Sequence, residues 1–289
     1  MAWAAVCLFW GTTGPGIRVV VRSMPPFLQG GVRFVFAGAL LLGVLMIRGK
    51  KLPRGWVTWR DVLLVSLLLC LANGLFSAGF LTVTGAVGTL IVSTVAIWIS
   101  VLEALRPGGS KPGLKAVLGL AVGIGGVAVL LPWHTGLTLR DAAGYGLLLV
   151  AALIWSFSTV YQRHRKFSER IDPFVSAGLQ LFLAGIMMCI VGLAIGELPR
   201  WNPTNEGLLA LVYLTIFGSL VGYVSFIYML EKLPADVVGI YTYINPLVAA
   251  GVDLFILREP PGTRFWAAAG LILLGVFLVQ RSEREKGRI

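Results

Sequence analysis

Residues 234–260 read Pro234-Ala-Asp-Val-Val-Gly-Ile-Tyr-Thr-Tyr-Ile-Asn-Pro-Leu-Val-Ala-Ala-Gly-Val-Asp-Leu-Phe-Ile-Leu-Arg-Glu-Pro260, and this stretch decides the fold. It can cross a bilayer as a helix, which takes about 20 residues at about 1.5 Å each. Its middle nevertheless carries four polar residues and a proline: Tyr241, Thr242, Tyr243, Asn245 and Pro246. Polar groups at membrane depth face a bundle interior or a wet cavity, and proline kinks a helix. The stretch predicts a membrane helix beside a cavity; the alternative is a kinked packing helix whose hydroxyls bond to neighbouring helices.

The rest of the chain has the same apolar character. Mean hydropathy is +0.86, and only 13% of residues are charged, about half the proportion of a soluble domain. Apolar runs recur from end to end, so we expect an all-α membrane protein with ten transmembrane helices. The predicted spans are residues 1–18, 27–47, 62–82, 86–105, 114–132, 142–162, 173–196, 206–230, 235–257 and 264–281.

Lys and Arg set the expected orientation. With the N-terminus in the cytoplasm, 17 of the 24 Lys and Arg residues fall in cytoplasmic segments, 6 fall in outside segments and Arg33 lies within a span. Cytoplasmic loops of membrane proteins carry the excess of basic residues. The sequence therefore predicts a multi-pass protein of the bacterial inner membrane with both termini cytoplasmic. The same bias explains the net charge of +11 without a nucleic-acid partner.

The chain also looks duplicated at an offset of about 145 to 150 residues. Trp10-Gly11 aligns with Trp155-Ser156, and Gly126 aligns with Gly275. Five spans in each half would place the second half upside down in the membrane, which is the architecture of alternating-access carriers. The predicted units are a first five-helix repeat at 1–133, an inverted second repeat at 141–281 and a basic cytoplasmic tail at 282–289.

Several motifs resemble a known family. They are Gly31-Val-Arg-Phe34 after a Pro-Pro, Thr84-Gly-Ala-Val-Gly-Thr-Leu-Ile-Val-Ser-Thr-Val95, Leu233-Pro-Ala-Asp236 and Tyr243-Ile-Asn-Pro-Leu247. The chain is similar to EamA-type transporters of the drug/metabolite transporter superfamily, and most similar to bacterial exporters of amino acids, including the aromatic amino acid exporter type. The resemblance implies a ten-helix carrier that exports small metabolites. Arg258-Glu259 stands where the family often has Leu-Gly-Glu.

Aromatic and polar residues near mid-span are the expected substrate-binding set. Aromatic walls suit flat, apolar or cationic solutes, and the polar residues share the same helices. For a single aromatic residue, packing against helices or lipid is the alternative. The predicted binding residues are Trp10, Asn73, Phe76, Phe80, Thr94, Trp98, Trp155, Tyr223, Tyr241, Tyr243 and Asn245.

Four polar residues occupy related places in the two halves, and we expect two gating or structural contacts, Arg33–Asp253 and Gln180–Glu103. An unpaired charge at mid-bilayer costs roughly 2.5–3.5 kcal/mol on insertion scales. The alternative is that the charged groups reach the interface separately.

The glycine-rich stretch after Trp10 lacks the Gly-Lys-Ser/Thr of a phosphate loop. We interpret it as a hinge or cavity lining, with close packing through small residues as the alternative. The predicted hinge residues are Gly14, Pro15, Gly16 and Pro246.

No catalytic or metal-binding motif occurs, so we expect no enzyme activity, no metal and no cofactor. We predict alternating-access export of small metabolites, with amino acids as the substrates that the resemblance implies. We expect the transport to be facilitative, because no carboxylate lies at the centre of a span. A multidrug or nucleotide-sugar-like carrier is one alternative, and a membrane-embedded lipid-modifying enzyme is another. The expected partners are a small-molecule substrate and the lipid bilayer, with the protein a monomer or weak homodimer.

Overall fold

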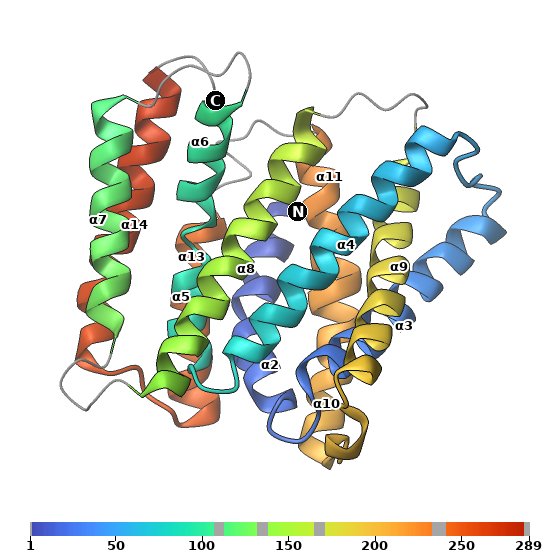
Figure 1. Ribbon diagram of the computed structural model, residues 1–289, viewed down its shortest axis with the longest axis horizontal. Coiled ribbons are helices and arrows are strands. Elements are labelled where there is room, and N and C mark those ends of the chain that lie inside the picture. The colour runs from blue at the N-terminus through green and yellow to red at the C-terminus, as the bar shows by residue number, and fades with distance from the viewer. Residues whose placement is uncertain (1, 107–112, 132–137, 165–170, 233–240, 286–289) are drawn as a thin grey trace.

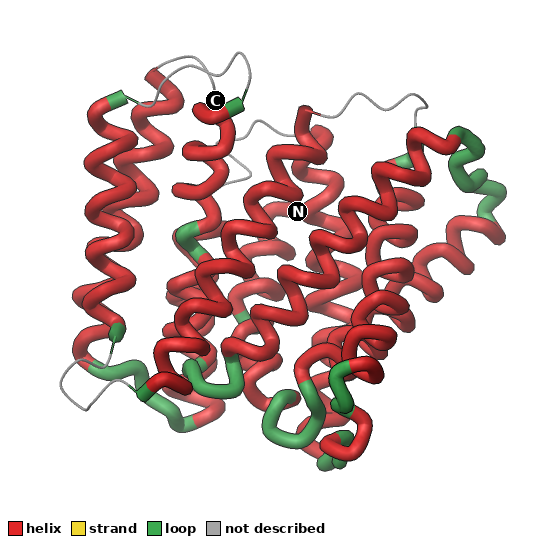
Figure 2. The backbone as a smooth tube through the Cα atoms, in the orientation of Figure 1, coloured by secondary structure: helices red, strands yellow, loops and turns green. Residues whose placement is uncertain are grey.

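The computed structural model describes residues 2–106, 113–131, 138–164, 171–232 and 241–285. Within these ranges the chain is helical and contains no strand, as the tube in Figure 2 shows. The predicted all-α class is therefore confirmed for the described residues. Residues 233–240, which include the start of the stretch 234–260, lie outside these ranges, as does the end of the predicted tail at 286–289.

Within the described ranges, seven helices are long and apolar enough to cross a membrane: Pro26–Ile47, Trp56–Gly79, Gly85–Leu105, Leu139–His164, Pro173–Ala194, Asn205–Lys232 and Thr263–Ser282. Two shorter apolar helices span Leu114–Leu130 and Tyr241–Leu257. The first apolar stretch is divided into three short pieces, α1 (Ala2–Ala5), the π-helical η1 (Val6–Trp10) and α2 (Thr13–Val20). The lengths and composition fit a polytopic membrane protein.

The elements follow one another along the chain as nearly all helix. After α2 come α3 (Pro26–Ile47), α4 (Trp56–Gly79), α5 (Gly85–Val92), α6 (Val95–Leu105), α7 (Leu114–Leu130), α8 (Leu139–His164), α9 (Pro173–Ala194), the 3₁₀ turn η2 (Leu198–Arg200), α10 (Asn205–Tyr213), the π-helical η3 (Leu214–Tyr223), α11 (Val224–Lys232), α13 (Tyr241–Val252), the π-helical η4 (Asp253–Leu257) and α14 (Thr263–Glu285).

Two helix pairs stand at opposite sides of the molecule, α7 with α14 and α3 with α9 (Figure 1). Glycines bring each pair together. A Cβ on Gly38 would lie 2.4 Å from the backbone nitrogen of Phe182, and a Cβ on Gly119 would lie 2.6 Å from the carbonyl oxygen of Gly275. Only small residues allow backbones to approach so closely. Gly119 of α7, in the fifth predicted span, is therefore used for packing within the chain.

Carboxylates fix where several helices begin. Glu197 accepts hydrogen bonds from the backbone nitrogens of Phe27 (3.2 Å) and Leu28 (2.8 Å), in the first turn of α3. Asp172 accepts from Phe174 N (2.9 Å) at the start of α9. These side chains satisfy helix N–H groups that have no partner within the helix. Burial alone would raise the pKa of Asp172, but its hydrogen bonds, first that with Lys50, outweigh this effect and place the pKa below the usual value.

Candidate functional site

A cavity lies between elements from the first and second parts of the chain and encloses about 820 Å³, counting the open space at its mouth. The elements that line it are η1, α2, α3, α4, α5 and α6 from the first part, and α8, η3 and α13 from the second. A solute in this cavity would therefore contact both parts at once.

Helical spacing explains how α4 contributes one wall. Leu69, Asn73, Phe76 and Phe80 all line the cavity, and they follow one another at intervals of four, three and four residues. Such intervals place side chains on one face of an α-helix. Mean hydropathy does not distinguish this face, because the whole helix is apolar. The spacing of the four residues, however, can be read from the sequence.

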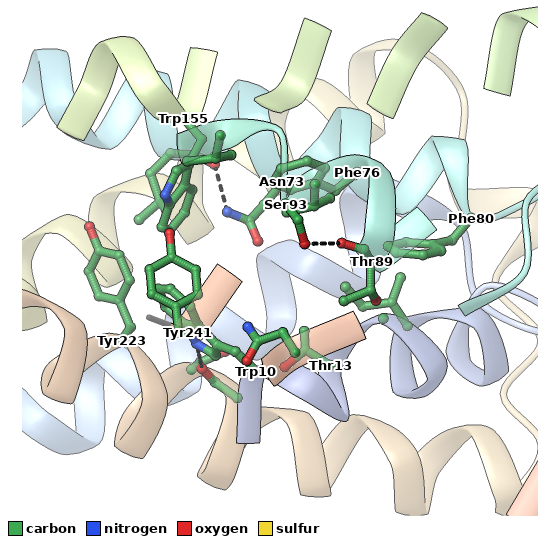
Figure 3. Close-up of a pocket in the computed structure, with 18 of the residues that line it drawn as sticks. Trp10, Thr13, Asn73, Phe76, Phe80, Thr89, Ser93, Trp155, Tyr223 and Tyr241 are labelled. Carbon is green, nitrogen blue, oxygen red and sulfur yellow. Dashed lines mark hydrogen bonds between the residues drawn. The ribbon is translucent and has the colours of Figure 1, made fainter. Parts of the chain in front are cut away.

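Aromatic rings close together form one end of the cavity. Trp10 contacts Trp155 and Tyr241 edge-on, with ring centroids 5.4 Å and 5.5 Å apart. The ring of Phe226 packs against both tryptophans, with its centroid 4.9 Å from that of Trp10 and 5.5 Å from that of Trp155. Edge-to-face pairs at these separations are favourable beyond the area that they bury. Figure 3 shows Trp155, Tyr241 and Tyr223 grouped on one side, with Phe80 on the other.

Two π-helical segments shape this aromatic end. Trp10 is the last residue of η1, and its indole Nε1 donates to the carbonyl oxygen of Gly218 in η3 at 3.0 Å. π-Helical turns loosen the regular i→i−4 ladder and occur often at functional sites. Gly222 gives the indole its room, because a Cβ there would lie 2.5 Å from Trp10 Nε1. Neither segment is foreseeable from hydropathy, which reports burial but not hydrogen-bond register.

The polar groups of the cavity come from several helices. Asn73 Nδ2 donates to Leu69 O at 3.2 Å, and Ser93 Oγ donates to Thr89 O at 3.2 Å, as Figure 3 shows. With its amide oriented to satisfy both contacts, Asn245 donates to Cys7 O (2.9 Å) and to Tyr241 O (3.1 Å). Asn245 thus joins α13 to η1 directly beside the aromatic end.

The cavity brings together eight of the eleven residues expected to bind substrate, namely Trp10, Asn73, Phe76, Phe80, Trp155, Tyr223, Tyr241 and Asn245. Three others do not line it. Tyr243 instead donates its hydroxyl to Gln280 on α14 at 3.0 Å, because two residues after Tyr241 the helix has turned by about 200°. Thr94 donates to Ile91 O at 2.7 Å, and Trp98, four residues on, packs against the apolar core.

The two expected polar pairs do not form. Arg33 Nη2 donates to Asn73 Oδ1 at 3.3 Å, while Asp253 Oδ2 accepts from the backbone nitrogen of Ala86 at 2.7 Å. The two side chains contact different elements, α4 for Arg33 and the first turn of α5 for Asp253. The prediction of an Arg33–Asp253 pair was wrong for this structure.

The second pair is likewise replaced by other partners. Gln180 Oε1 accepts from the hydroxyl of Tyr223 at 2.5 Å and so positions a ring of the cavity wall. Glu103 lies 2.6 Å from Nε2 of His164, across the ends of α6 and α8. Gln180 therefore supports the cavity from α9, and Glu103 joins two helix ends.

Other charged groups, Arg18, Arg22 and Glu259, lie at the end of the cavity near Phe80. Arg18 Nη1 donates to the carbonyl oxygens of Phe80 and Leu81, each at 2.8 Å. Arg22 at the end of α2 forms an ion pair with Glu259, just after η4. Since Phe80 lines the cavity, these contacts hold together the ends of α2, α4 and η4 on the side opposite the aromatic rings.

The expected hinge residues lie in tightly packed surroundings. Gly14 lines the cavity, and a Cβ on it would lie 2.1 Å from Thr89 Oγ1. Pro15 is buried inside α2, Gly16 packs against Leu214, and Pro246 is buried inside α13. These glycines permit close approach between helices; the hinge function stays a prediction.

Sequence reasoning missed several lining residues that carry hydroxyls, namely Thr13, Thr89, Ser93, Ser219 and Thr242. Thr89 and Ser93 are four residues apart and therefore share a helix face, a signal that was available in the sequence. Arg33, which we expected to act as a gate, also lines the cavity.

Comparison with known proteins agrees with this architecture. The model of the EamA-like transporter family matches residues 1–131 and again residues 142–281. The inner membrane transporter YedA of Escherichia coli strain K12 is 30% identical over 280 residues, which cover 95% of this chain and 88% of YedA. The chloroplastic WAT1-related protein of Arabidopsis thaliana is 26% identical over 290 residues, which cover 95% of this chain and 67% of that protein.

The fold also matches a solved structure. A protein of known crystal structure superposes on this chain with a TM-score of 0.72 and 20% sequence identity. The match covers 98% of this chain and 96% of that protein's chain. The two successive family matches together span nearly the whole sequence. The chain therefore belongs to the EamA-like transporter family.

Proposed function

We propose that this protein is a ten-span, alternating-access carrier, built of two inverted five-helix repeats, that exports small metabolites including aromatic amino acids. The observation that carries the proposal is the cavity, whose walls come from both parts of the chain and whose aromatic end joins Trp10 of η1 to Trp155 of α8. In an inverted-repeat carrier the site lies between the repeats near the bilayer midplane.

Further support comes from how equivalent elements pair. In the proposed repeats, α3 and α9 are the second spans, and α7 and α14 are the fifth spans. Each of these pairs packs glycine against backbone, as expected for two related halves facing each other. The two family matches divide the chain at nearly the same place as the proposed repeats.

Facilitated movement fits the composition of the cavity wall. Among the described residues, no Asp or Glu side chain lines the cavity. Proton-coupled carriers use an ionisable carboxylate within the membrane. We therefore propose that the solute gradient drives transport in the inner membrane, with both termini of the protein in the cytoplasm.

Uptake of labelled amino acids into proteoliposomes tests the proposal. Wild-type uptake should saturate and should be unchanged by a pH gradient. Trp155→Ala should weaken the apparent affinity by about tenfold or more, since truncation of an aromatic hot-spot residue costs about 2 kcal/mol or more and about 1.4 kcal/mol is tenfold. Trp98→Ala is the matched control, because Trp98 is a half-buried tryptophan that does not line the cavity.

Three results would count against the proposal. Equal losses for both tryptophan variants would remove the cavity as the substrate site. Acceleration by the pH gradient would replace facilitation with proton coupling. Uptake of drugs or nucleotide sugars, without any amino acid, would reject the proposed substrate and retain the carrier.

A further inference from the structure

One charged side chain lies inside the cavity without a charged partner, and it belongs to Arg33. The residue is 2% exposed and lines the cavity. It is the eighth residue of α3, which places it about 11 Å along the helix axis from Pro26. A charged side chain within a transmembrane segment is costly, and such residues usually mark a functional site.

Most of the hydrogen-bonding capacity of this guanidinium is unused. Nη2 donates to Asn73 Oδ1 at 3.3 Å, and Nε and Nη1 have no partner among the described residues. Arg33 Cζ lies over the ring of Phe34, 4.7 Å from the ring centroid, in a cation–π contact. A buried donor without an acceptor carries the full cost of its lost hydration, so these donors call for an acceptor in the cavity.

Among the described residues, no carboxylate is hydrogen-bonded to the Arg33 guanidinium. Asp253 is engaged by the backbone of α5, and Glu197 is engaged by the first turn of α3. Both acids stabilise helix ends. The remaining candidate for a negative group beside Arg33 is therefore the solute itself.

We propose that Arg33 binds the carboxylate of the transported solute, with the apolar body of the solute against Trp10, Trp155 and Tyr241. This inference rests on the proposed function and narrows its substrates to small amphipathic carboxylates, zwitterionic amino acids among them. The planar fork of a guanidinium matches a carboxylate with two parallel N–H···O bonds. Organic cations that lack an acid group are excluded by the same charge.

Matched pairs of ligands test the inference in the purified wild-type protein. Quenching of tryptophan fluorescence would be titrated with phenylalanine and phenylalaninamide, and then with 3-phenylpropionate and 3-phenylpropionamide. Each pair differs in the carboxylate. At least one acid should bind about tenfold or more tightly than its amide, because hydrogen bonds between charged groups are roughly twice as strong as neutral ones and a guanidinium–carboxylate pair forms two of them.

Substitution of the guanidinium provides the second arm. Arg33→Gln should remove the preference for the acid, and Arg33→Lys should retain part of it. Arg48→Gln is the matched control, since Arg48 is an exposed arginine just after the last turn of α3. Thermal unfolding of each variant shows whether it is folded, and the ligand pairs on wild type do not depend on any variant.

The outcomes separate this inference from the proposed function. Equal binding of acid and amide by wild type, or an acid preference that persists in a folded Arg33→Gln variant, would overturn the role of Arg33 and leave the carrier intact. Binding of no ligand from either pair would also overturn it, and the uptake assay would then decide whether the carrier proposal survives.

Discussion

At the scale of single residues, the site depends on the space around one indole. Trp10 contacts Trp155, Tyr241 and Phe226 and donates to Gly218 O. Its position is possible because residue 222 has no side chain. The ring that forms the end of the cavity is therefore held by a glycine of another element.

Gly222→Ala should displace the indole of Trp10. The added methyl would lie 2.5 Å from Nε1, and overpacking of this kind typically costs about 1–3 kcal/mol. We expect a lower unfolding temperature, a shifted tryptophan emission and weaker solute binding. Thermal unfolding and fluorescence titration of the purified variant would measure these effects.

Gly146→Ala provides the control, because a Cβ at Gly146 would meet nothing within 4 Å. Alanine favours a helix over glycine by about 1 kcal/mol, so this variant should be neutral or slightly more stable. If Gly222→Ala behaves in the same way, the close fit at Trp10 is not important for the site.

At the scale of elements, the ends of α2 and η4 meet through charged groups. The Arg22 and Glu259 side chains are 47% and 32% exposed, and exposed ion pairs are worth about 0.2–1 kcal/mol. Such a contact can open and re-form at little cost. We therefore interpret it as a latch on the end of the cavity near Phe80, in place of the Arg33–Asp253 pair expected from the sequence.

A double-mutant cycle tests this latch. Arg22→Gln and Glu259→Gln should each increase labelling of a cysteine placed at Thr89, inside the cavity, by a water-soluble maleimide. The double variant should be labelled no faster than the single variants, since each change alone breaks the pair. Strictly additive effects, or no change in labelling rate, would contradict the latch.

At the scale of the whole molecule, exposed arginines mark the two ends of the α3 membrane span. The first turn of α3 is hydrogen-bonded to Glu197, and Arg200 follows Glu197 by three residues, so Arg200 lies near the start of α3. Arg48 lies just after the other end of α3. A helix of 22 residues is about 33 Å long, so these two exposed arginines lie near opposite membrane faces.

Arg200→Cys and Arg48→Cys should therefore label differently with a membrane-impermeant maleimide. With cytoplasmic termini, the cysteine at position 200 should react in intact cells and the cysteine at position 48 only after the cells are opened. The parent chain is the control for its own three cysteines. The reverse pattern would invert the topology derived from the positive charges.

The sequence by itself determined the features that follow from composition and period. Apolar runs had to become helices, because a bilayer leaves no water to satisfy exposed backbone groups. The all-α membrane class therefore followed, and so did eight of the 21 residues that line the cavity, since polar groups at mid-span face the bundle interior or a cavity. Trp10, Asn73, Trp155 and Tyr241 were all identifiable in this way.

Only the tertiary structure decided which direction each side chain faces. Tyr241 and Tyr243 look alike in the sequence, yet one lines the cavity and the other bonds to α14. Arg33 and Asp253 were expected to pair, yet one lines the cavity and the other holds the start of α5. The physical reason is that hydropathy reports depth, whereas helix rotation, π-helical register and glycine contacts depend on the packing of all the helices together.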